Sequence, residues 1–393
     1  MLLNAADPAL QADPFPLYRR LREESPVIEL DDGTWLVTRH TDVSALLRNR
    51  SISSAQVGGD PGGPVAELEV NGRNLMIASD PPVHTRRRGA VAPRFTVHPV
   101  QALRPAVEAH VEHRLDEVAA RLAIDGVVDL VPTFCSRIPM DTLCSLLGLP
   151  LEDEGRLRRW TTDLIDGIDP WAGPDAAVRA GAALAEVCPY LDRFLAERRC
   201  HPTDDLLSAL ATAPDLTPDE QLHNAVLFLN AGLDTSGDLV ANALGLLLET
   251  PGAWATLVAD PERVAPLAVE EAARVDSPVQ VSMRRTIGPV AVGDVTIPEG
   301  RPLLLGLGAA NRDPEVFDEP DRFLVERDDR RHVAFGGGAH LCLGAPIARL
   351  EVATALQALA RRLPDLALVG EAGWRSRLAF RGRATLPVRA SRR

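Results

Sequence analysis

The chain has 393 residues, of which 46% are hydrophobic and 25% are charged, a balance typical of a globular protein with a large apolar core. Its formal net charge is −13, and all 42 basic residues are arginine, so we expect neither nucleic acid nor an anionic membrane as a partner. Its first residues lack the layout of a signal peptide, and no apolar run reaches the ~18 residues of a membrane helix, which predicts a cytoplasmic protein.

Helical hydrophobic periodicity dominates the chain, and strand-like segments are short. No repeat, low-complexity linker or change of composition divides the sequence, so residues 1–393 are predicted to form a single domain. The fold class that follows is mainly α with a small β region. The predicted helices cover residues 15–24, 100–122, 134–147, 176–199, 218–249, 261–275 and 345–362, and the predicted strands cover 35–38, 290–297 and 301–307.

The helix predicted over residues 218–249 is unusually long. Thr217 and Glu220 form a capping box, Pro218 occupies the first helical position, and Pro251 and Gly252 end the pattern. At 1.5 Å per residue this helix spans roughly 50 Å. Because it is apolar on most sides, we expect it to pass through the core.

A glycine-rich segment, FGGGAHLCLG, occupies residues 335–344 and ends where a helical pattern begins. It places Cys342 near a helix N-terminus, where backbone N–H groups and the helix dipole favour a thiolate. The five cysteines are odd in number and lack paired spacing, which argues against disulfides, zinc and covalent haem attachment. A buried cysteine in a simple turn is the alternative.

This segment resembles the Cys-ligand loop of the cytochrome P-450 family, F-x-x-G-x-H/R-x-C-x-G. The resemblance implies the P-450 fold, with a long central oxygen-binding helix, and a non-covalent haem b whose iron is bound by the thiolate. Cys342 then becomes the metal ligand. The positions that match are Phe335, Gly338, His340, Cys342 and Gly344.

A cluster of poor helix formers interrupts the middle of the long helix at residues 231–235. A kink or a close helix crossing would explain it, but it also resembles the family's A/G-G-x-D/E-T motif. By that resemblance Ala231 and Gly232 make room for dioxygen, and Asp234 and Thr235 deliver protons.

Glu271 and Arg274 form an E-x-x-R pair that could be an ordinary surface ion pair on one helix face. Glu319 begins the sequence EPDRF, which contains Arg322. In the family the corresponding three side chains form a buried triad that supports the Cys loop, so the resemblance implies a Glu271–Arg274–Arg322 triad.

His84 and Arg88 lie four residues apart in DPPVHTRRR and share one helix face, a spacing that suits carboxylates. A basic helix start is the alternative. The segment resembles the family's D-P-P-x-H-T-x-x-R motif, which binds the haem propionates. The resemblance adds Arg284 and His340 as further propionate donors, although Arg285 leaves the register beside Arg284 open.

Asn230 precedes Ala231 where family members usually carry an aliphatic residue, so it is predicted either to contact substrate or to bond a nearby helix carbonyl or water. The resemblance implies four further pocket-lining residues: Met76, Val279, Gln280 and Phe380.

The resemblance implies a monooxygenase that inserts one atom of O2 into a small organic molecule, such as a specialised metabolite, by hydroxylation, epoxidation or oxidative coupling. Electrons would come from a separate ferredoxin or flavodoxin, and the protein would be a monomer. The alternatives are a haem-binding sensor without turnover and a peroxide-driven peroxygenase. A basic docking patch for the donor is predicted beside the Cys loop from Arg86, Arg87, Arg330, Arg331 and Arg349.

Overall fold

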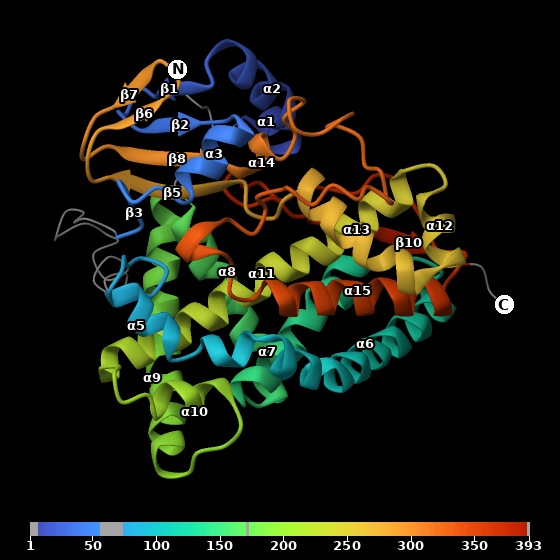
Figure 1. Ribbon diagram of the computed structural model, residues 1–393. Helices are drawn as coiled ribbons and strands as arrows, with labels where there is room; N and C mark the ends of the chain where they lie inside the picture. The colour runs from blue at the N-terminus through green and yellow to red at the C-terminus, as the bar shows by residue number, and fades with distance from the viewer. Residues whose placement is uncertain (1–6, 56–73, 170–172, 391–393) are drawn as a thin grey trace.

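A computed structural model describes residues 7–55, 74–169 and 173–390. Helices form one large part of the molecule, the strands of the largest sheet gather at one end of it, and the strand Pro387–Arg389 lies apart from them (Figure 1). The α-helices are α1 (Pro8–Ala12), α2 (Phe15–Glu24), α3 (His40–Leu46), α5 (Val83–Gly89), α6 (Val97–Asp125), α7 (Arg137–Leu147), α8 (Glu154–Ile168), α9 (Pro174–Cys200), α10 (Leu206–Ala211), α11 (Pro218–Glu249), α12 (Ala253–Ala259), α13 (Pro261–Val275), α14 (Leu307–Ala310) and α15 (Ala345–Arg362).

The main sheet joins strands from the first 53 residues to strands from residues 281–306. Its order is β1-β2-β8-β5-β3, and only the β2–β8 pair is parallel. A β6–β7 hairpin turns at Gly293, whose φ of 58° suits glycine, and the third sheet has the order β4-β10-β9. The strands are β1 (Val27–Glu29), β2 (Trp35–Val37), β3 (Ile52–Ser53), β4 (Val128–Asp129), β5 (Val281–Thr286), β6 (Val290–Val292), β7 (Val295–Ile297), β8 (Pro302–Gly306), β9 (Ala367–Leu368) and β10 (Pro387–Arg389).

Helix α11 has the bounds and the capping box that the sequence predicts. The Thr217 hydroxyl accepts the Glu220 N–H at 3.2 Å, and the Glu220 carboxylate accepts the Thr217 N–H at 2.9 Å. The helix packs against α7, α8, α9, α13 and α15 and crosses the centre of the helical part in Figure 1. The prediction that it passes through the core is confirmed.

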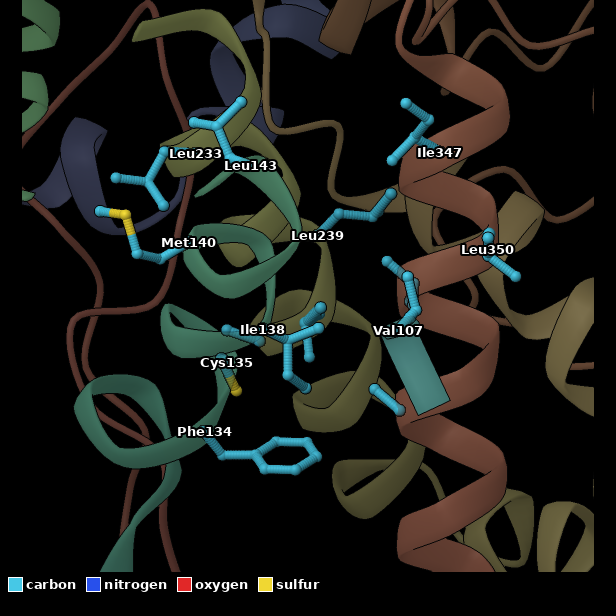
Figure 2. Close-up of a cluster of buried hydrophobic side chains, with 14 of the residues drawn as sticks. Val107, Phe134, Cys135, Ile138, Met140, Leu143, Leu233, Leu239, Ile347 and Leu350 are labelled. Atoms are coloured by element: carbon cyan, nitrogen blue, oxygen red, sulfur yellow. The ribbon is translucent and has the colours of Figure 1, made fainter. Parts of the chain in front are cut away.

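Side chains from α6, α7, α11 and α15 interlock in the apolar core (Figure 2). Val107, Ile138 and Leu239 are among them, and each is at most 2% exposed. Of these helices, α7, α11 and α15 also carry residues of the cavity described below, so core packing fixes those walls of the site. No helix of the described residues is long and apolar enough to cross a bilayer.

The predicted helices over 15–24, 261–275 and 345–362 have the bounds that the structure shows. The helix predicted from residue 134 begins at Arg137 instead, because a π-helical turn occupies Val131–Cys135. Helix α8 and strand β5 were not predicted, and both help to form the cavity. The assignment of the whole chain to one domain stays a prediction.

Candidate active site

A cavity of about 1060 Å³ lies between α11 and the loop that carries Cys342, and its walls are mostly apolar. Residues were predicted to bind haem, to deliver protons or to contact substrate. All of them line this cavity except Asp234 and Gln280. Those that do are Met76, His84, Arg88, Asn230, Ala231, Gly232, Thr235, Val279, Arg284, Phe335, His340, Cys342 and Phe380.

Cys342 lies between a 3₁₀ turn (Gly338–His340) and α15. Its N–H donates to the Phe335 carbonyl at 2.9 Å and closes the loop. Burial raises the pKa of the Cys342 thiol, while hydrogen bonds to the sulfur from the N–H groups of Gly344 and Ala345 oppose that rise. A metal cation at the sulfur would displace the proton and shift this balance to the thiolate.

The third glycine of the loop is required by the fold itself. Gly338 has a φ of 63°, and a Cβ there would lie 2.4 Å from the Leu47 carbonyl oxygen at the end of α3. Glycine is therefore required at position 338 by a close approach to the protein's own backbone.

A cationic edge of the cavity, formed by His84, Arg88, Arg284 and His340, fits a dianionic ligand. The His84 and His340 rings lie 4.2 Å apart. Arg88 and Arg284 each donate to a backbone carbonyl, at 2.8 and 2.7 Å, and neither forms an ion pair within the described part of the chain. Burial lowers the pKa of all four groups, that of His340 to about 4. Two propionates would supply the missing negative charge.

Arg285, the alternative to Arg284 in that register, donates to the Gly300 carbonyl at 2.7 Å. The cationic edge and the open sulfur of Cys342 belong to the same cavity. The residues present therefore fit a non-covalent haem held through its propionates and its iron.

Thr235 and Asp234 point in different directions from α11. The Thr235 hydroxyl lines the cavity and donates to the Ala231 carbonyl at 2.8 Å, which leaves its oxygen lone pairs free to accept. The Asp234 carboxylate is buried and lies 3.1 Å from Arg377 and 3.5 Å from Arg375. Asp234 therefore does not line the cavity, and its carboxylate pairs with Arg375 and Arg377 near the C-terminus.

A second buried acid, Glu351 of α15, was not predicted. It lines the cavity, and its carboxyl accepts hydrogen bonds from Ser236 and Thr142. Burial raises the pKa of Glu351 to about 7, and Oε2 has no partner among the described residues. Burial of this kind favours the protonated form of the carboxyl group. The sequence signal that could have revealed this buried acid is a single glutamate between two apolar residues, Leu350 and Val352.

The E-x-x-R pair is buried, but its predicted third member is wrong. Both Glu271 oxygens accept from Arg274 at 2.8 Å. Arg327, rather than Arg322, adds a third contact at 3.0 Å to Glu271. The Arg322 side chain is 66% exposed and pairs with Glu319, while only its backbone carbonyl accepts from Arg274.

Replacing Glu271 with glutamine should destabilise the protein by about 3–5 kcal/mol, because it strands the fully buried Arg274 charge. Arg327→Gln should also lower the urea midpoint. The matched control, Arg322→Gln, should change the free energy of unfolding by less than about 0.5 kcal/mol. A larger loss for Arg322→Gln than for Arg327→Gln would contradict this assignment of the triad.

Three of the four positions that the resemblance implied for substrate, here called the substrate wall, line the cavity. Val279 and Phe380 pair across an isolated antiparallel bridge and, with Met76, line the cavity. Gln280 is a correction: it is buried, donates to the Ser277 carbonyl at 2.6 Å and packs against Gly308. These contacts hold the Gln280 amide in the protein interior, away from the cavity that Val279 lines.

The predicted basic patch is also corrected, because every one of its arginines faces a carboxylate. Arg86 and Arg87 share Glu220. Arg330, Arg331 and Arg349 lie beside Asp328, Asp329 and Glu270, respectively. The patch therefore carries little unpaired charge.

Comparison with known proteins identifies the family of the chain. A sequence model described as Cytochrome P450 matches residues 263–363. The cytochrome P450 monooxygenase PikC of Streptomyces venezuelae is 38% identical to this chain, and the match covers 98% of this chain and 93% of PikC. The 6-deoxyerythronolide B hydroxylase of Saccharopolyspora erythraea is 38% identical over 97% of this chain and 98% of its own.

Solved structures agree in fold. P450BioI, in complex with a ligated acyl carrier protein, superimposes with a TM-score of 0.93 at 28% identity, covering 98% of this chain and all of its own. Ligand-free CYP164A2 of Mycobacterium smegmatis gives 0.89 at 35% identity and covers 99% of each chain.

These relatives are haem-thiolate monooxygenases, and the cavity has the residues to hold such a haem. The chain belongs to the cytochrome P450 family. Its cofactor is non-covalent haem b, which when bound activates dioxygen.

Proposed function

We propose that this monooxygenase oxidises a mainly apolar specialised metabolite with electrons from a separate ferredoxin or flavodoxin. The observation that carries the proposal is the single apolar cavity shared by Thr235, Cys342 and the substrate wall. Relatives are named for oxidising 6-deoxyerythronolide B and vitamin D3. These names support a large, mainly apolar substrate for this chain.

Proton delivery is assigned to Thr235 and Asp234. The Thr235 oxygen is free to accept a hydrogen bond from a group in the cavity. Asp234 lies at the preceding position of α11, where Arg375 and Arg377 flank its carboxylate. Thr235 would orient water, and the Asp234 carboxylate would relay a proton by taking it up from solvent and passing it to that water.

The electron donor is proposed to dock over the Cys342 loop. Leu341, beside the ligand cysteine, is 49% exposed, so a bound partner reaches the immediate neighbourhood of the sulfur. Since the nearby arginines are paired, we expect shape and apolar contact to contribute more to docking than unpaired charge does.

Ligands are first identified by a screen for spin-state shifts that includes 6-deoxyerythronolide B and vitamin D3. Turnover of each ligand is then measured in one reaction with a ferredoxin system and in another with peroxide alone. Product should require both O2 and a ferredoxin system. Turnover with peroxide alone would favour the peroxygenase, and tight binding without any product would favour the sensor.

Asn230 is proposed to bind a polar group of the substrate. It lines the cavity, and its Oδ1 is buried without a hydrogen-bond partner in the described part of the structure. An unpaired amide costs about 1–3 kcal/mol, and substrate is the available partner.

Asn230→Leu should therefore weaken binding of a substrate with a hydroxyl or amide donor by about 10- to 100-fold. Binding of an apolar analogue of the same shape should be unchanged. Spin-state titrations of both ligands measure the difference. Equal affinities of Asn230→Leu and the wild type for the polar ligand would show that the amide does not contact substrate.

A further inference from the structure

A buried carboxylate lies on the outer side of the Cys342 loop. Glu270 of α13 is 8% exposed. It accepts from Arg349 Nε at 2.6 Å and Nη2 at 2.9 Å, and His332 Nε2 lies 3.1 Å away. The bidentate contact fixes the plane of the Arg349 guanidinium.

The fixed guanidinium lies against the Cys loop itself. Arg349 Cζ is 4.4 Å from the centroid of the Phe335 ring. Phe335 lines the cavity and accepts the Cys342 N–H, so it connects the arginine to the ligand cysteine. Arg349 lies seven residues beyond Cys342 on α15, which is two helical turns.

We propose that the Glu270–Arg349 pair tunes the reduction potential of the thiolate-ligated haem iron. One added electron makes the iron–thiolate unit more negative. A cation nearby favours that reduced state, and an anion opposes it. Arg349 therefore raises the potential, and Glu270 both positions Arg349 and partly cancels its charge. Both are positioning residues that act through Phe335 and Cys342.

The two single variants are expected to move the potential in opposite directions. Glu270→Gln leaves the Arg349 charge without its counter-ion and should raise the potential. Arg349→Gln leaves Glu270 unopposed and should lower it. The double variant should return toward the wild-type value. Spectroelectrochemical titration of the purified haem protein measures all three without substrate or electron donor.

A structural role predicts a different pattern. Loss of a supporting contact would shift both variants in the same direction or release haem from both. Arg349→Lys separates the two cases, because it keeps the charge but loses the bidentate geometry. The proposed role predicts a potential nearer to the wild type for Arg349→Lys than for Arg349→Gln. The carbonyl spectrum of each ferrous variant confirms that the thiolate is retained.

The matched control is Glu262 with Arg361, an exposed ion pair that joins the same two helices, α13 and α15, away from the loop. Glu262→Gln and Arg361→Gln should leave the potential unchanged. Shifts of one sign in the Glu270 and Arg349 variants, or shifts no larger than those of the control pair, would overturn the proposal. Product formation is not measured in this test, so its failure is distinct from failure of the proposed substrate oxidation.

Discussion

Cys342→Ser is expected to abolish the red-shifted Soret band that ferrous haem-thiolate proteins show under carbon monoxide. Serine keeps the loop geometry but removes the sulfur, and its hydroxyl does not ionise near neutral pH. The cavity that holds haem remains, so haem content should fall less than the thiolate band does. Absorption spectra of the reduced, carbonyl-bound protein measure the effect.

The control for this prediction is another cysteine of the same chain. Cys200 is exposed at the end of α9, and Cys135 and Cys144 are buried in the core. Cys200→Ser should leave the band unchanged. Persistence of the band in Cys342→Ser, or its loss in Cys200→Ser, would show that the ligand has been assigned to the wrong residue.

Thr235→Ala is expected to divert electrons from product to hydrogen peroxide. Alanine lacks the Thr235 hydroxyl, so a water molecule in the cavity loses the oxygen that would accept its hydrogen bond. Because positioned proton transfer contributes about 10²–10⁴-fold, we expect product per electron to fall at least about tenfold. Substrate binding should be nearly unchanged. The ratios of reductant consumed, peroxide released and product formed measure the coupling.

Thr235→Ser is the matched control, since it restores the hydroxyl and should recover most of the coupling. Asp234→Asn should slow turnover without releasing as much peroxide, because Asp234 lies behind the cavity. Coupling in Thr235→Ala equal to that of the wild type would exclude the hydroxyl from proton delivery.

Elements with local start and stop signals could be predicted from the sequence. The capping box at Thr217 and the proline at residue 218 define the start of α11 without reference to the rest of the chain. Helix α8 carries Gly155 and Gly167 and no side-chain cap, so its signals were weak. Strand β5 has polar residues on both faces because it borders the haem site.

Site residues within one short motif were also predictable, whereas partners from distant loops were not. Cys342, Phe335 and His340 share a single loop, so their spacing limits their geometry. Arg327 reaches Glu271 from 56 positions away in an irregular segment, and no periodicity distinguishes it from Arg322. The direction of a side chain in such a segment depends on tertiary packing, which also explains the correction at Gln280.

The most direct test of the central claim is isotope labelling during turnover with ¹⁸O₂, ferredoxin and the best ligand from the spin-state screen. A monooxygenase transfers one ¹⁸O atom to product and reduces the other to water. The expected product carries one ¹⁸O and is formed only when the electron donor is present. A product with unlabelled oxygen, or one formed equally well from peroxide without the donor, would contradict it.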